Sequence, residues 1–322
     1  MTPPIGRQAL DRLRLSLNRS VPTRGLGALR RRRMGQSQEF REFREYAPGD
    51  DIRRVDWQAS LRRGADWERV SRVFESDEQA TVAILIDCRA GMYLPEALPK
   101  VQIAIWMAQC LASVVAREGN RLVLGTLFGG DSDLTPTASS GNGVYRACRR
   151  LCQVVIDKFP QGTEWEAVAE CHVGPILRQL GTVSATILIS DMLFDAKDPK
   201  IRHFAKEAHR GYRTLNIVEL NAWPMERALL AAGPLRLGAM EGVSVGDTLW
   251  DATNDILVQA ERNLLDHRRM LQRAMSGPGL IWPQKPIGWP TQATPETAAA
   301  KHLFRREFPR AVASGGLMTV SG

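Results

Sequence analysis

The sequence predicts an α/β fold, with a Rossmann-like parallel sheet covered by helices on both faces. Between about residues 80 and 220 of the 322-residue chain, short apolar runs alternate with longer segments of helical periodicity. The runs are apolar almost without interruption, which is typical of strands buried on both faces. Strands and helices that alternate in this way form parallel sheets.

The predicted elements follow one another in a regular order. Apolar runs indicate strands at residues 81–87, 121–128, 183–191 and 212–220. Apolar periodicity indicates helices at residues 95–119, 144–159, 164–180 and 199–210. A small hairpin around 235–249 and an amphipathic helix over 251–275 complete a main domain that spans residues 81–276.

Two of the predicted strands end in an acid, the first in Asp87 and the third in Asp191. In open parallel sheets, ligands bind outside the carboxyl ends of the strands. Asp87 and Asp191 are therefore placed where functional carboxylates are expected.

Charge and composition divide the rest of the chain. Residues 1–38 hold nine arginines and one acid, Asp11, so this segment accounts for the whole net charge of +8. We expect a basic flexible arm there, a motif-bearing element packed on the main domain at 39–80, and a largely disordered tail at 277–322. The remaining body is neutral, which does not favour nucleic acid as its partner.

Composition also excludes several classes of protein. No apolar run is long enough to span a membrane, and the N-terminus lacks the apolar segment of a signal peptide, so we expect a cytoplasmic protein. The five cysteines have no framework spacing and are expected to be reduced core residues. No phosphate-binding loop, zinc-protease motif or serine-nucleophile motif is present. We therefore expect neither an enzyme nor a cofactor.

The segment 44–57 combines acids, arginines and apolar residues. Pro48-Gly49 predicts a turn, after which Asp50 or Asp51 is placed to cap a short helical turn ending at Asp56. The segment is either a structural ion-pair network held by Trp57 or a surface that binds a partner. The candidate residues are Arg44, Tyr46, Gly49, Asp50, Asp51, Arg53, Asp56 and Trp57.

The same segment carries a resemblance to a known family. Together with Arg62-Arg63 and the strands that end at Asp87 and Asp191, it resembles the domain of unknown function 58 family over roughly residues 20–275. Members look like von Willebrand factor A-type domains, which implies a Rossmann-like sheet. The resemblance also implies a MoxR-type AAA+ ATPase as partner, and a role as adaptor or chaperone partner in assembling or metallating other proteins. Further matching positions are Glu226, Gly233 and Glu241-Gly242.

The resemblance raises the question of a metal. Von Willebrand A-type domains often bind Mg²⁺ through Asp-x-Ser-x-Ser at the end of the first sheet strand, the metal-ion-dependent adhesion site. Here Arg89 and Gly91 stand at the serine positions that follow Asp87, so the site is degenerate and no metal is expected. We expect the Arg89 guanidinium to replace the cation and to pair with Asp87 or Asp191.

The sequence leaves three candidate functions. The leading one is a non-enzymatic adaptor that acts with the AAA+ ATPase on a client of unknown identity. The second is a Mg²⁺-dependent protein or hydrolase that uses Asp87, Asp191 and acids of the Asp50-Asp51 loop. The third is binding to nucleic acid or an anionic membrane through the arginines of residues 7–33.

Overall fold

The computed structural model forms two compact units, residues 22–79 and the remainder of the chain. It describes residues 3–15, 40–46, 55–62, 70–74, 80–94, 98–128, 130–131, 134–139, 141–158, 171–172, 176, 178, 180–210, 213–233, 235–236, 249–250, 252–283, 286, 298–314 and 318–320.

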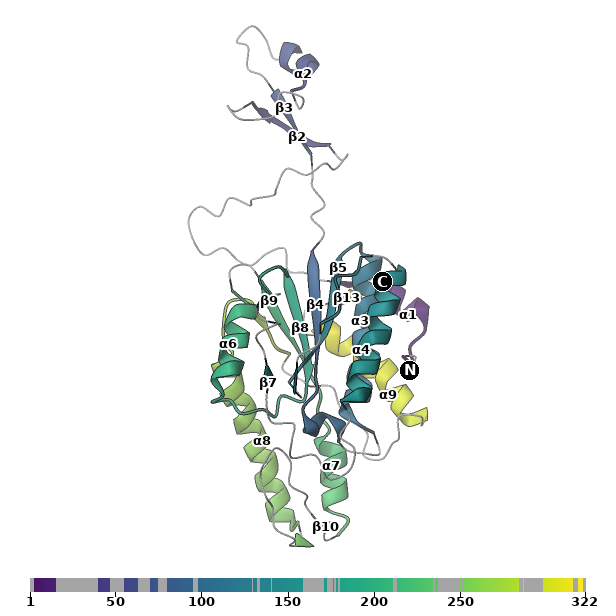
Figure 1. Ribbon diagram of the computed structural model, residues 1–322, viewed down its shortest axis with the longest axis vertical. Coiled ribbons are helices and arrows are strands. Elements are labelled where there is room, and N and C mark those ends of the chain that lie inside the picture. The colour runs from purple at the N-terminus through teal and green to yellow at the C-terminus, as the bar shows by residue number, and fades with distance from the viewer. Residues whose placement is uncertain are drawn as a thin grey trace. The chain divides into compact units, whose positions relative to one another are not determined.

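The larger unit is built on a five-stranded sheet whose strand pairs are all parallel (Figure 1). In spatial order the strands are β12 (Leu280–Ile281), β9 (Thr214–Glu219), β8 (Ala185–Ser190), β4 (Thr81–Asp87) and β5 (Arg121–Leu127). The predicted α/β class and its four predicted strands are confirmed, because each strand is within two residues of its expected bounds. The fifth strand, β12, was not predicted.

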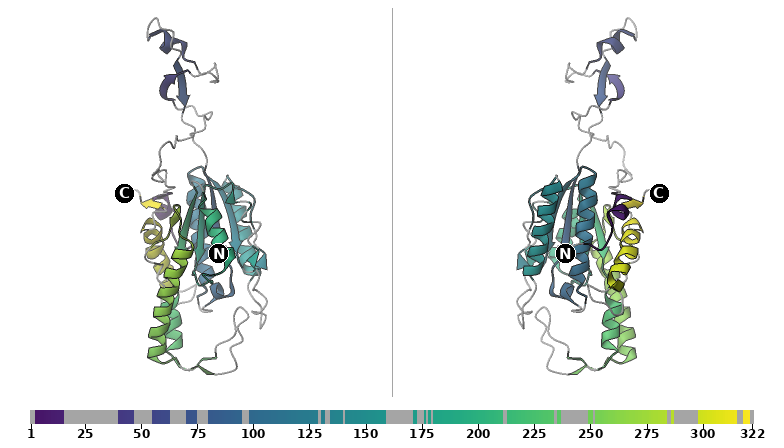
Figure 2. Two further views of the ribbon diagram at one scale, coloured as in Figure 1. Left: turned by 90° about the vertical axis from the view of Figure 1, so that its left-hand side faces the viewer. Right: turned by 90° about the vertical axis from the view of Figure 1, so that its right-hand side faces the viewer.

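Helices cover both faces of this sheet (Figure 2). One core joins Val82, Ile84 and Ile86 of β4 to α3 (Lys100–Arg117), α4 (Gly141–Asp157) and α9 (Ala298–Ser314). The other joins Ala83 and Leu85 to α6 (Pro199–Ala208) and the C-terminal end of α8 (Asn254–Ala274). Successive residues of β4 thus enter opposite cores, which explains why the strand is apolar from Val82 to Ile86.

Short elements complete the larger unit. A 3₁₀ turn (Ala90–Tyr93) follows β4, and α7 (Trp223–Leu230) follows β9. β10 (Leu235–Arg236) pairs antiparallel with β11 (Leu249–Trp250), which confirms the expected hairpin. The helix expected over 164–180 is wrong at Cys171–His172, which form β7 and pair with β6 (Gly130–Asp131) in a parallel bridge.

The smaller unit contains the motif-bearing segment. Its strands β2 (Phe40–Glu45) and β3 (Val70–Phe74) pair antiparallel, and α2 (Trp57–Arg62) lies between them in sequence. The packing of residues 39–80 on the main domain stays a prediction.

The tail at 277–322, expected to be largely disordered, carries ordered elements. Phe304, Phe308 and Val312 of α9 recur every four residues and are buried in the same core as α3. The Phe304 ring meets Trp106 edge-on at 5.5 Å and stacks on Phe308 at 5.2 Å. The tail's Pro, Gly and Ala content suggested disorder, but one apolar face per helix is enough to bury a segment.

The basic arm is likewise not flexible throughout. Its described residues form α1 (Arg7–Asp11) and β1 (Leu13–Leu15), and β1 pairs antiparallel with β13 (Met318–Val320) near the other end of the chain. Leu13 is buried, and the Arg117 guanidinium donates to the carbonyls of Leu10 and Leu13. Leucines spaced three apart give the arm an apolar side that its charge count conceals.

None of the helices in the described part of the chain has both the length and the apolarity needed to span a lipid bilayer.

Replacing Phe308 by Ala tests whether the tail is part of the core. The side chain is fully buried, so we expect a loss of about 3–5 kcal/mol in the free energy of unfolding, measured by urea denaturation. The control is Lys301→Ala on the exposed side of α9, which should change stability by less than about 0.5 kcal/mol. Equal, small effects of the two substitutions would contradict the packing of α9.

Candidate functional site

The carboxyl ends of β4 and β8 bring the two predicted acids together. These strands are direct neighbours in the sheet. Asp87 is fully buried and Asp191 is nearly so. Ser190 donates its hydroxyl hydrogen to Asp87 Oδ2 at 2.7 Å. Burying carboxylates in this way requires compensating cations or hydrogen-bond donors.

Arg89 supplies the first cation and bridges both acids. Its Nη2 lies 2.6 Å from Asp87 Oδ2 and 2.7 Å from Asp191 Oδ1, and its Nε donates to Asp87 Oδ2 at 3.1 Å. The guanidinium also lies over the rings of Phe128 and Phe194, at 5.7 and 5.0 Å from their centres. Arg89 was expected to pair with Asp87 or Asp191, and in the structure it pairs with both.

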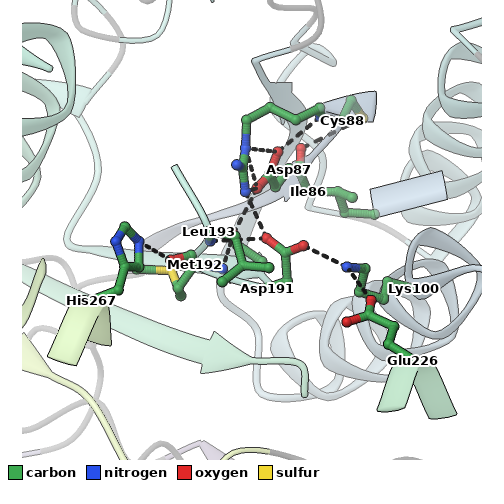
Figure 3. Close-up of polar contacts among 11 residues, drawn as sticks. Ile86, Asp87, Cys88, Lys100, Asp191, Met192, Leu193, Glu226 and His267 are labelled. Atoms are coloured by element: carbon green, nitrogen blue, oxygen red, sulfur yellow. Dashed lines mark hydrogen bonds and ion pairs between the residues drawn. The ribbon is translucent and has the colours of Figure 1, made fainter. Parts of the chain in front are cut away.

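Lys100 supplies a second cation, which sequence reasoning missed. Its Nζ lies 2.7 Å from Asp191 Oδ2 and 3.2 Å from Glu226 Oε1 (Figure 3). The ammonium is almost completely buried, whereas Glu226 is 28% exposed. The available signal was a lone lysine at the first position of α3, ahead of a helix that is apolar nearly all round. Glu226 was noted only for its family resemblance.

We call Asp87, Arg89, Lys100, Asp191 and Glu226 the ion-pair network. Burial opposes the ionisation of Asp191, but Lys100 and then Arg89 outweigh it and lower the pKa of Asp191 well below its usual range. Burial also opposes the charge on Lys100, yet Asp191 and Glu226 raise the pKa of Lys100 above its ordinary value. Asp191 and Lys100 therefore stay charged at neutral pH.

The backbone is strained where two strands end. Phe128 after β5 has φ +64° and Met192 after β8 has φ +58°, a left-handed conformation that non-glycine residues adopt at a cost. Both residues are buried. The turn at Met192 leaves the next side chain, Leu193, exposed, while the Leu193 N–H donates to Asp191 Oδ1 at 3.1 Å. The strained turn thus joins the ion-pair network to an exposed apolar side chain.

A cleft of about 180 Å³ adjoins the network between α7 and α8. Lys100, Asp191 and Glu226 form part of its wall, and Leu193 and Leu265 contribute exposed apolar surface.

The arrangement does not fit a Mg²⁺ ion. Arg89 forms ion pairs with Asp87 Oδ2 and Asp191 Oδ1, and Lys100 forms one with Asp191 Oδ2. Gly91 lies beside Asp191, since a Cβ there would be 3.7 Å from Asp191 Oδ2, but it offers no side-chain ligand. Among the described residues, no group of three or more His, Cys, Asp or Glu side chains is placed to hold a metal.

Nor does the network offer an activated nucleophile. Burial and then the Asp87 charge raise the pKa of the Cys88 thiol to about 12, so it stays protonated at neutral pH. The Ser190 hydroxyl donates to Asp87, but the Asp87 carboxylate is already held by Arg89. The residues are arranged to neutralise charge.

The motif 44–57 is only partly described. Gly49, Asp50, Asp51 and Arg53 lie outside the described residues, as does the side chain of Arg44, while Tyr46 is half-buried. The helical turn expected to end at Asp56 is wrong in its described part.

Asp56 instead precedes α2 and caps it, accepting a hydrogen bond from the Ala59 N–H at 2.9 Å on Oδ1. Trp57, the first residue of α2, is 54% exposed. The two interpretations of the motif, as a structural ion-pair network or as a surface that binds a partner, both stay predictions.

Fold and site together define an α/β domain whose strand-end carboxylates are paired with the chain's own cations. The chain belongs to the family described as "Protein of unknown function DUF58", whose model matches residues 42–260. No curated protein matches the chain. It is similar to a solved structure, the conserved hypothetical protein BatB from Bacteroides thetaiotaomicron, with 13% identity over 73% of this chain and 100% of that one. The TM-score is 0.36, a likeness too low to support an argument about fold or function.

Arg89→Met tests the central pairing. The substitution leaves two carboxylates buried with too little positive charge, and we expect a loss of about 3–5 kcal/mol in the free energy of unfolding at pH 7. Arg210→Met, which removes an exposed ion pair with Glu207, is the matched control and should cost less than about 1 kcal/mol. Urea denaturation measures both. An effect of Arg89→Met as small as that of the control would contradict the network.

Lys100→Met tests the electrostatics through pH. Because the folded-state pKa of Asp191 is lowered, its ionisation adds stability above the unfolded value of about 3.9, and this is lost as pH falls through the folded pKa. Removing Lys100 raises that pKa and reduces the added stability. We therefore expect the stability gap between wild type and Lys100→Met to be largest above about pH 4 and to narrow below it, measured by urea denaturation from acid to neutral pH. A gap independent of pH would contradict the assignment.

Proposed function

We propose that this protein is a non-enzymatic, protein-binding adaptor that acts with a MoxR-type AAA+ ATPase in the assembly or maturation of other proteins. The observation that supports it best is the ion-pair network. Asp87 and Asp191 stand where a sheet of this type presents functional carboxylates, and both are held by internal cations. Acids held in this way favour a binding role over catalysis. The ATPase as partner is inferred from the family resemblance.

The two alternative functions receive less support. A Mg²⁺-dependent role would require displacing Arg89 and Lys100 from the carboxylate oxygens they occupy. Binding to nucleic acid or an anionic membrane would use the arginines of residues 7–33. Part of that segment, β1, is instead paired within the fold, and Leu13 is buried.

Affinity capture tests the adaptor function. The full chain, immobilised in extract from its native cells with ATP present, is expected to retain a AAA+ ATPase identified by mass spectrometry. Trp57→Ala is expected to keep the fold, because Trp57 is exposed, and to lose most of the ATPase. Tyr145→Ala, which removes another exposed aromatic side chain, is the control and should retain it.

The outcome for Trp57→Ala distinguishes the two interpretations of the segment 44–57. Loss of the ATPase from a folded Trp57→Ala variant supports a binding role for the segment 44–57, whereas unfolding of the variant supports a structural role. No AAA+ ATPase on the wild-type chain would overturn the proposed function.

A further inference from the structure

The cleft is lined by residues of both α7 and α8. Figure 1 shows that these two helices extend past the sheet. The C-terminal end of α8 is held in the core by Leu271 and Met275. Earlier in the same helix, Leu265 lines the cleft and is 54% exposed. One wall of the cleft is therefore formed by α8, whose C-terminal end is fixed in the core.

The size of the cleft limits what it can hold. Its volume of about 180 Å³ is below the roughly 300–1,000 Å³ typical of small-molecule sites. It is suited to one large side chain of another protein, the kind of group that provides most of the energy of an interface.

The cleft also has apolar surface that contacts solvent. Leu193 and Leu265 are exposed, and Trp223, which is partly buried, also lines the cleft. The indole Nε1 of Trp223 is buried and has no hydrogen-bond partner among the described residues. A buried donor without an acceptor is costly, and because this nitrogen does not reach the cleft surface, Trp223 contributes ring surface to the cleft wall.

The charge of the cleft is opposite to that of the chain. The whole chain carries +8, yet the cleft is lined by four carboxylates and two fixed cations. Both cations are already neutralised within the wall. Lys100 is held by Asp191 and Glu226, and Arg268 donates to Glu219 Oε2 at 2.7 Å.

The exposed charge is therefore negative. It comes mainly from the partly exposed Glu226, which shares the Lys100 ammonium with Asp191, and from Glu261, which is 49% exposed and lies 3.7 Å from Arg227 among the described residues. Exposed carboxylates beside apolar surface complement a partner that carries a cation next to an apolar side chain.

We infer that this cleft, lined by Leu193, Trp223, Glu226, Glu261 and Leu265, docks a protein segment that carries one large apolar side chain beside an arginine or lysine. The apolar side chain enters between Leu193 and Leu265, and the cation faces Glu226 and Glu261. This inference rests on the protein-binding role proposed above and names the chemistry of the partner.

A peptide titration tests it. The probe is an acetylated, amidated peptide with one phenylalanine followed by one arginine in a glycine–serine background, added to the full chain with methyl-labelled leucines. We expect saturable NMR shifts at Leu193 and Leu265. Peptides with glutamate in place of arginine, or serine in place of phenylalanine, should bind at least about tenfold more weakly, a difference of about 1.4 kcal/mol.

Matched variants locate the binding. Leu265→Ser and Glu261→Lys should each weaken the peptide by about tenfold or more. Met270→Ser and Asp266→Lys are controls on the same helix, since both residues are exposed and neither lines the cleft. These controls should leave affinity unchanged. Equal effects of cleft and control variants, or no preference for the basic apolar peptide, would overturn the inference.

The result is distinguishable from that of the proposed function. Retention of the ATPase by a chain that does not bind the peptide would leave the adaptor role standing and overturn the cleft. Peptide binding in the cleft without an ATPase partner would do the reverse.

Discussion

The pairing of two buried carboxylates with two internal cations is the constraint on which the site depends. Asp87 and Asp191 come from adjacent strands, Arg89 from the turn after β4, and Lys100 from the start of α3. Buried ion pairs contribute little net stability compared with apolar residues of the same volume, yet breaking one is costly. The network therefore fixes the relative positions of the strand ends and α3 more than it stabilises the fold.

Glu226 extends this constraint to the surface. It contacts Lys100 from α7, so the buried charges connect with the cleft between α7 and α8. The strained turn at Met192 makes a second connection between the network and the cleft. The Leu193 N–H donates a hydrogen bond to Asp191, and the Leu193 side chain lines the cleft. A change in the network would therefore alter the positions of Glu226 and Leu193.

Much of the fold could be predicted from sequence, because strands buried on both faces produce uninterrupted apolar runs such as 82–86. The placement of Asp87 and Asp191 at carboxyl ends of strands was predicted in the same way, whereas their proximity depends on β4 and β8 being neighbours in the sheet. Lys100 and α9 could not be predicted in the same way. The charge of Lys100 is neutralised by residues 91 and 126 positions away, and Phe308 meets a core formed by distant segments. The local sequence shows a lone lysine and apolar residues four positions apart, but it does not show which distant residues they contact.

A fixed guanidinium differs from a bound Mg²⁺ in one respect that bears on function. A metal exchanges with solvent and can accept a ligand from a partner, whereas Arg89 is covalently part of the chain and its contacts with Asp87 and Asp191 are already made. A partner therefore gains little from these two acids directly. The strand-end face can still contribute to binding through groups that remain exposed next to the network, and Glu226, at 28%, is the most exposed member of the network. Recognition is thereby displaced from the buried carboxylates to the adjoining cleft.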